Sequence, residues 1–249
     1  MGTAKVGVHG IPTRKSATAV FGGGKRFVPP AEADRETGDL ARSISFLAKS
    51  TIFAESEPAI AVYKVIRGIA GVYKMLGDGR KQIVAFALPG DFLGSPFSDQ
   101  YTCSVDTISE VAARQFPRAQ FLTSLRANPE SLYLTLEAAL QETNVARDHM
   151  LLLGRGTAEE KFAEFIISWR GRVGRVGALA NLVPLPMSRR DIADFLGLTI
   201  ETISRVLAKL ERENVIRVIP EGLQLMGPTE RPLLIERGLT SFINVEARH

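Results

Sequence analysis

The 249-residue sequence is poor in the residues that build disulfide frameworks and metal clusters. It contains one cysteine and three histidines, and the histidines (His9, His149 and His249) lie far apart. One thiol cannot make a disulfide framework, a four-cysteine zinc site or an iron–sulfur cluster held by four thiolates of this chain. The histidine spacing contains no local zinc motif. We therefore expect no metal and no cofactor.

Aromatic residues and long apolar runs are also scarce. Aromatics make up 7% of the chain, with one tryptophan, which argues against a stacking platform for single-stranded nucleic acid. No apolar run approaches the ~18 residues of a membrane span, and the first 25 residues lack the apolar core of a signal peptide. We expect a cytoplasmic protein with no membrane partner. The net charge of +4 mildly favours polyanionic partners.

Composition and turn signals divide the chain into four segments. Residues 1–25 are rich in glycine, alanine, threonine and lysine and are expected to form a mobile basic tail. Residues 26–128 are expected to form a β-roll, with Gly77-Asp78-Gly79 as a hairpin turn. Frequent glycines between short apolar strands favour a small antiparallel barrel or jelly roll. The expected strands are 62–66, 70–75, 82–88, 101–107 and 111–116.

The apolar period changes to that of a helix near Pro129, and residues 129–153 form the third segment. Spacings that alternate between four and three form a seam along this helix. The seam consists of Leu132, Leu136, Ala139, Thr143, Ala146, Met150 and Leu153. Such a seam predicts pairing with a second copy, and hence a homodimer; the alternative is an amphipathic helix that lies on its own domain. His149 lies beside the seam and is expected at the surface.

The fourth segment, residues 154–249, contains the pattern of a winged helix-turn-helix. A first helix is expected over 157–172. Ser188, followed three residues later by Asp191, is a capping signal for the next short helix. Gly197 supplies a tight turn, since a left-handed backbone costs glycine least. The whole chain is therefore expected to have an α+β fold: an N-terminal antiparallel, jelly-roll-like β-roll, a long dimerisation helix and a C-terminal winged helix-turn-helix.

The helix after the turn, 200–213, has the composition of a recognition helix. Thr199 is its expected cap, and two apolar runs at 216–219 and 223–225 are expected to pair as a β-hairpin wing. We expect Glu201, Ser204 and Arg205 to read base edges in the major groove of double-stranded DNA. The alternative for Glu201 and Arg205 is a surface ion pair four residues apart. Residues expected to contact the DNA backbone or to position the helix are Ser188, Arg189, Thr199, Thr202 and Lys209.

Residues 196–205, Leu-Gly-Leu-Thr-Ile-Glu-Thr-Ile-Ser-Arg, resemble the recognition element of the CRP/FNR superfamily of bacterial transcription regulators, and specifically its FNR and FixK branch. Gly68, Gly77 to Gly79, and Gly90-Asp91-Phe92-Leu93-Gly94 resemble the family's β-roll sensor. Ala158-Glu159-Glu160-Lys161 resembles the start of its DNA-binding domain. The resemblance implies that Glu201, Ser204 and Arg205 read a palindrome with TTGA-like half-sites. CRP-type TGTGA half-sites are not implied, because Ile200 and Ser204 differ from the CRP pattern.

The same resemblance locates where effectors of the family would bind. Its cyclic-nucleotide binders carry a glutamate after Gly-Asp-Phe-Leu-Gly and an arginine further on, whereas this chain has Ser95 and no arginine or lysine from 95 to 104. A buried phosphate would have no cation there. FNR holds its cluster with four cysteines, three of them near the N-terminus, and that tail has none here; Cys103 is expected to be a small buried hydrophobe. Some FixK proteins carry a redox-sensitive cysteine where this chain has Ser188.

The resemblance therefore implies an activator that works with RNA polymerase in oxygen-limitation or nitrogen-fixation control, without cyclic nucleotide or iron–sulfur cluster. An alternative is a ligand-gated regulator with an unidentified small molecule in the β-roll. An enzyme is not expected, because the sequence offers no nucleophile–base pair, metal cluster or phosphate loop.

Overall fold

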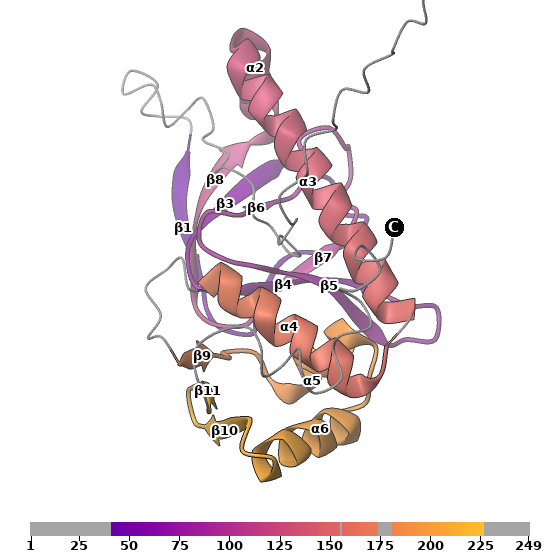
Figure 1. The fold of residues 1–249 in the computed structure, drawn as a ribbon. Coiled ribbons are helices and arrows are strands. Elements are labelled where there is room, and N and C mark those ends of the chain that lie inside the picture. The colour runs from indigo at the N-terminus through magenta and orange to yellow at the C-terminus, as the bar shows by residue number, and fades with distance from the viewer. Residues whose placement is uncertain (1–40, 155, 174–180, 227–249) are drawn as a thin grey trace, which may run out of the picture.

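The computed structural model describes residues 41–154, 156–173 and 181–226. The predicted basic tail, residues 1–25, lies outside these residues. Two four-stranded antiparallel sheets form the N-terminal part (Figure 1). One sheet has the order β1 (Arg42–Phe46), β8 (Val111–Pro117), β3 (Ala61–Arg67) and β6 (Phe92–Leu93). The other has the order β2 (Thr51–Phe53), β7 (Ser104–Thr107), β4 (Ala70–Met75) and β5 (Lys81–Ala87).

Buried apolar side chains from both sheets form the core of this β-roll. Phe53, Tyr63, Val65, Val105 and Val111 belong to it. The expected hairpin is present: β4 pairs antiparallel with β5, and Leu76 and Arg80 are hydrogen bonded across the Gly77–Gly79 turn. The prediction that the N-terminal domain is an antiparallel, jelly-roll-like β-roll is therefore confirmed.

Strands β1 and β2 were not expected from the sequence. Strand β1 alternates only weakly between exposed and half-buried residues, and it is held by pairing with β8, as in Arg42 opposite Gln115. The strand expected over 101–107 begins at Ser104. The Tyr101 side chain ties its own segment to β3 instead, because its hydroxyl donates to the Ala61 carbonyl at 2.9 Å.

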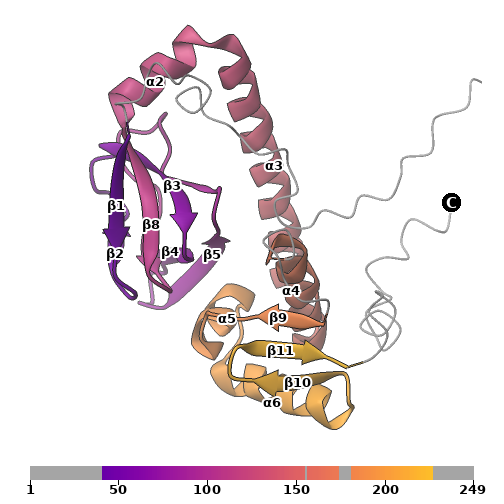
Figure 2. The same cartoon turned by 90° about the vertical axis from the view of Figure 1, so that its left-hand side faces the viewer.

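Two helices lead away from the β-roll. Helix α2 (Arg118–Ala127), which was not expected, packs Phe121 and Leu125 against Val62 and Phe116. Helix α3 (Pro129–Gly154) then runs beside the β-roll, from α2 to the start of the C-terminal part (Figures 1 and 2). None of the helices in the described ranges is long and apolar enough to cross a membrane.

The expected seam of α3 is exposed in the single chain. Leu132, Leu136 and Met150 are 46%, 57% and 65% exposed. Ala139, Thr143 and Ala146 are exposed as well, and only Leu153 is half-buried. The alternative of a helix that lies with this face on its own domain is therefore wrong for the six exposed residues.

The C-terminal part is a winged helix-turn-helix at the end of the molecule opposite α2 (Figure 2). It contains α4 (Ala158–Val173), β9 (Leu182–Pro184), α5 (Arg189–Leu196), α6 (Ile200–Arg212), β10 (Ile216–Ile219) and β11 (Gly222–Leu225). The wing hairpin β10–β11 is extended by β9 into a three-stranded sheet. These elements confirm the expected α+β fold.

One apolar cluster joins the helix-turn-helix to the β-roll. Ile83 and Phe86 of β5 belong to the same buried cluster as Phe165, Trp169 and Phe195. The Phe86 ring lies 5.8 Å from the Trp169 ring and 5.2 Å from the Phe195 ring, centroid to centroid. The two parts of the chain are therefore packed against each other through strand β5.

Candidate nucleic-acid interface

Helix α5 begins at a reciprocal cap, as the sequence predicts. The Ser188 side chain accepts from the Asp191 backbone N–H, and the Asp191 carboxylate accepts from the Ser188 backbone N–H at 2.8 Å. Each side chain satisfies a backbone donor that a helix N-terminus leaves unpaired. The cap is exposed, so Ser188 and Arg189 stand at the surface of the domain.

The turn between α5 and α6 is built as expected. Gly197 has φ 63° and ψ 37°, and its N–H donates to the Ala193 carbonyl. A side chain at this left-handed position would be strained. Thr199 caps α6, because its hydroxyl accepts from the Thr202 N–H at 3.2 Å. The first turn of α6 is thereby fixed against α5.

The first two turns of α6 carry a polar face. Ile203, Val206 and Leu207 are buried, whereas Glu201 and Arg205 are exposed and Ser204 is half-buried. The Arg205 guanidinium donates to the Thr202 hydroxyl at 3.4 Å, and in the described part of the chain it forms no ion pair with Glu201. The pKa of Glu201 is lowered chiefly by its own backbone N–H and by Thr199, with Arg190 and Arg205 contributing less. The surface ion pair is therefore not formed here.

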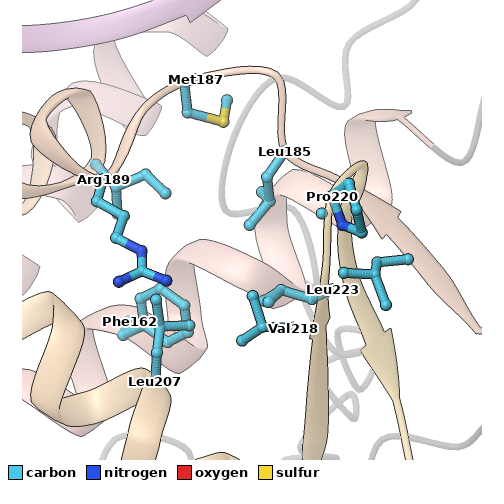
Figure 3. A pocket seen from close by; sticks show the side chains of 11 residues that line it. Phe162, Leu185, Met187, Arg189, Leu207, Val218, Pro220 and Leu223 are labelled. Carbon is cyan, nitrogen blue, oxygen red and sulfur yellow. The ribbon is translucent and has the colours of Figure 1, made fainter.

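Arg189 lies next to this face from the start of α5. One of its guanidinium nitrogens is 3.4 Å from the Ser204 hydroxyl. Its side chain lines a mainly apolar cavity of about 200 Å³ together with Phe162, Leu207 and Val218 (Figure 3). Arginine packs its methylene stem on apolar surface and keeps its charge in water. Arg189 and Ser204 are thus brought together although they lie on different helices.

Lys209 is less free than the sequence suggested. Its ammonium forms an ion pair with Glu159 of α4 at 3.0 Å, and both side chains are nearly half exposed. Exposed pairs of this kind contribute little and break readily. Lys209 lies two turns beyond the start of α6, so it is farther from the base-reading positions than Thr202.

His149 is buried, so the expectation of a surface histidine is wrong. It is 6% exposed and its ring stacks on Phe195 of α5 with the centroids 4.2 Å apart. Burial lowers the pKa of His149, and the hydrogen bond with the Phe195 carbonyl opposes that shift only in part. The helical period places His149 beside the seam, on a face of α3 that packs against α5. Its partner there, Phe195, lies 46 residues further along the chain.

Two features of the β-roll bear on effectors. Ser95 is exposed, and its hydroxyl accepts from the Phe97 N–H at 3.2 Å. Cys103 is half-buried, and burial raises the pKa of its thiol, so the thiol stays protonated at neutral pH. In the described ranges, no three His, Cys, Asp or Glu side chains gather where they could hold a metal ion.

Comparison with known proteins assigns both parts of the chain. Residues 185–216 match the sequence profile of bacterial regulatory proteins, crp family, and residues 43–128 match that of the cyclic nucleotide-binding domain. The chain is 47% identical to the transcriptional activatory protein AadR of Rhodopseudomonas palustris over 79% of its length and 82% of the relative. It is 46% identical to the nitrogen fixation regulation protein FixK of Bradyrhizobium diazoefficiens, over 78% and 82%. The chain belongs to the CRP/FNR family, in its FixK-like branch.

Solved structures of the CRP/FNR family share this fold. FixK2 from Bradyrhizobium japonicum superposes with a TM-score of 0.70 at 35% identity, covering 76% of this chain and 93% of FixK2. Membership of this family confirms a DNA-binding transcription regulator, and its members' names describe regulators rather than enzymes.

Proposed function

We propose that this protein is a sequence-specific transcription activator that binds a palindrome of TTGA-type half-sites as a homodimer. The observation that carries the proposal is helix α6, which is capped by Thr199, buried on one face, and polar on the face that carries Glu201, Ser204 and Arg205. A recognition helix enters the major groove with its N-terminal residues against the base edges.

Each of the three side chains suits one feature of a base edge. The Arg205 guanidinium is exposed and can form a bidentate pair with guanine O6 and N7. The Glu201 carboxylate, kept ionised by its lowered pKa, accepts from the cytosine N4 amino group. The Ser204 hydroxyl bonds with either kind of partner. Sequence preference therefore comes from the first two turns of α6.

Polar groups around α6 are suited to the phosphate backbone. Ser188, Arg189, Thr199 and Thr202 stand at or near the N-terminal ends of α5 and α6, where helix dipoles favour anions. We assign Lys209 to the same set, since a phosphate competes with its exposed partner Glu159. Such contacts position the protein without selecting a sequence.

The exposed apolar face of α3 supports the homodimer. Leu132, Leu136 and Met150 would bury against a second copy, and exposed apolar patches of this kind mark interaction sites. Two copies related by a two-fold axis match the two half-sites of a palindrome.

The physiological part of the proposal rests on the relatives. AadR is named an activatory protein and FixK a nitrogen fixation regulation protein. These names support activation in nitrogen-fixation control. The resemblance to the FNR and FixK branch extends the proposal to oxygen limitation and to activation through RNA polymerase. The neutral Ser95 and the single cysteine support control without cyclic nucleotide or iron–sulfur cluster.

Selection of bound sequences from a random DNA pool, with no ligand added, tests the proposal. The expected product is a palindrome with TTGA-like half-sites. Recovery of unrelated sequences, or of single half-sites, contradicts the proposed readout or the dimer. Binding that emerges only when a cell extract of small molecules is added supports the alternative of a ligand-gated regulator.

A further inference from the structure

The C-terminal end of α5 receives hydrogen bonds from outside the DNA-binding domain. The Gln82 amide of β5 donates to the Asp194 carbonyl at 2.5 Å. Its second N–H is shared between the Ile83 carbonyl at 3.1 Å and the Phe195 carbonyl at 3.3 Å. The His149 ring of α3 is 3.0 Å from the same Phe195 oxygen through Nε2. A carbonyl only accepts, so the neutral ring carries its proton on Nε2 in this bond. We call Gln82, His149 and the end of α5 the junction.

These bonds satisfy acceptors that the helix itself leaves unpaired. The last four carbonyls of an α-helix have no partner within it, and α5 ends at Leu196. A buried carbonyl without a donor is costly, and Phe195 is only 3% exposed. The β-roll and the dimer helix thus each supply a donor that α5 needs in its docked position.

A second contact fixes the same domain from α4. The Arg172 guanidinium donates to the Phe86 carbonyl at 2.8 Å and forms an ion pair of 2.6 Å with Asp91. Its side chain is 16% exposed. The Phe86 ring packs near both Trp169 of α4 and Phe195 of α5. Polar bonds on two sides of an aromatic cluster select one orientation, which apolar contact alone does not.

The junction lies directly before the recognition helix. Phe195 is followed by the Gly197 turn and the Thr199 cap of α6, and that turn is closed by bonds from Gly197 and Leu198 to the Ala193 carbonyl. A change in the position of the end of α5 is therefore passed to the start of α6. Because His149 sits on the seam helix, the junction also relates α6 to the dimer axis.

We propose that Gln82 and His149 are positioning residues that set the separation and tilt of the two recognition helices on DNA. The proposal rests on the proposed function, because it assumes a dimer that reads two half-sites. The separation and tilt of the recognition helices determine which spacing between half-sites the dimer prefers. They do not change which bases each helix selects.

The test compares wild type with Gln82→Leu and His149→Phe on the selected palindrome and on versions with the spacer one base pair shorter or longer. We expect each variant to bind the palindrome about tenfold more weakly, which is about 1.4 kcal/mol. We also expect each to discriminate less between spacers, with the same half-site bases selected. Gln115→Leu is the matched control, since its amide contacts Tyr63 within the β-roll at 3.3 Å. It should keep the wild-type spacer preference.

The single tryptophan gives a readout without DNA. Trp169 is buried beside Phe86, so loosening of the junction should shift its fluorescence to longer wavelength in both variants and leave Gln115→Leu unchanged. Wild-type fluorescence together with wild-type spacer preference in both variants overturns the proposal. Equal weakening on every spacer also overturns it, because that is a general structural effect. If wild type binds no palindrome, the proposed function is contradicted. A shift in the fluorescence of the two variants would in that case still show that Gln82 and His149 hold the junction together.

Discussion

Replacement of Arg205 tests whether this residue reads a base or only contacts the DNA backbone. Arg205→Ala should relax the preference for guanine in each half-site, because a bidentate arginine–guanine pair contributes about 1–3 kcal/mol of discrimination. Affinity is measured for the palindrome and for a version with the guanine replaced. Arg189→Ala is the control. It should weaken binding to both DNA sites alike, because Arg189, at the start of α5, is assigned to the phosphate backbone and not to a base. An unchanged ratio in Arg205→Ala assigns that base to another residue.

His149 makes stability depend on pH in a defined direction. Burial lowers its pKa in the folded chain, whereas an unperturbed histidine titrates near about 6.5. Below that value the unfolded chain binds a proton that the folded chain resists, so stability falls as the pH falls. The melting temperature of wild type should therefore drop more between about pH 7.5 and about pH 5.5 than that of His149→Phe. Equal drops would assign the dependence to other groups.

Single residues show which signals a sequence carries. The roles of Ser188, Gly197 and Thr199 in local structure follow from sequence because each acts within about three residues of itself. The burial of His149 does not follow, because its partner Phe195 is 46 residues away. The contacts of Gln82 do not follow from sequence either, because a lone glutamine in a strand belongs to no motif.

Among the elements, α3 has the most direct test. Leu136→Glu and Met150→Glu should each yield monomers, because a charge in a paired seam would be buried against its own copy. Light scattering measures the mass. Asn144→Glu, on an exposed position of α3 off the seam, is the control and should stay dimeric. Dimers in both seam variants would place the interface elsewhere.

The wing depends on a glycine that touches the neighbouring strand. A Cβ at Gly222 would lie 2.2 Å from the Val183 carbonyl oxygen and 2.7 Å from the Leu185 nitrogen, at φ +148°. Backbone strain alone costs about 1–3 kcal/mol. Gly222→Ala should therefore lower the free energy of unfolding by more than that amount. Gly79→Ala, at φ +82° with open space around it, should show only the strain. Denaturant titration compares the two, and equal losses would contradict the steric argument.

Elements with strong periodicity, or with a cap or turn signal, were predicted well, whereas elements without such a signal were missed. Helices α3, α4 and α6 and the β4–β5 hairpin lie close to their expected bounds. Strands β1, β2, β6 and β9 and helix α2 were missed, because each is held by a partner that is distant in the sequence, such as β8 for β1 and β7 for β2. Tertiary pairing decides such segments more than intrinsic propensity does.

For the whole molecule, DNA binding should need no added effector. A ligand shifts a conformational equilibrium only by its differential affinity for the two states. Residues 95–104 offer no cation to a cyclic phosphate, and one cysteine cannot supply the four thiolates of an iron–sulfur cluster. Purified protein in air should bind the palindrome at full strength, and Cys103→Ser should bind equally well. The measurement is a titration of labelled operator with and without cyclic AMP, in air and after anaerobic iron–sulfur reconstitution. A tenfold tightening, about 1.4 kcal/mol, contradicts this prediction.

The sequence by itself determined the caps, the turn, the periods of the long helices and the polar face of α6, because these depend on neighbours within one or two helical turns. Tertiary structure alone decided which way the helix-turn-helix faces. Gln82 bonds to Asp194 across 112 residues of chain, and His149 to Phe195 across 46. Such contacts exist only when the domains dock, and docking depends on the shape and burial of the complete apolar cluster around Phe86. No local pattern encodes that shape. The Gln82 amide and the His149 imidazole find their acceptors only when packing removes water from the carbonyls of α5.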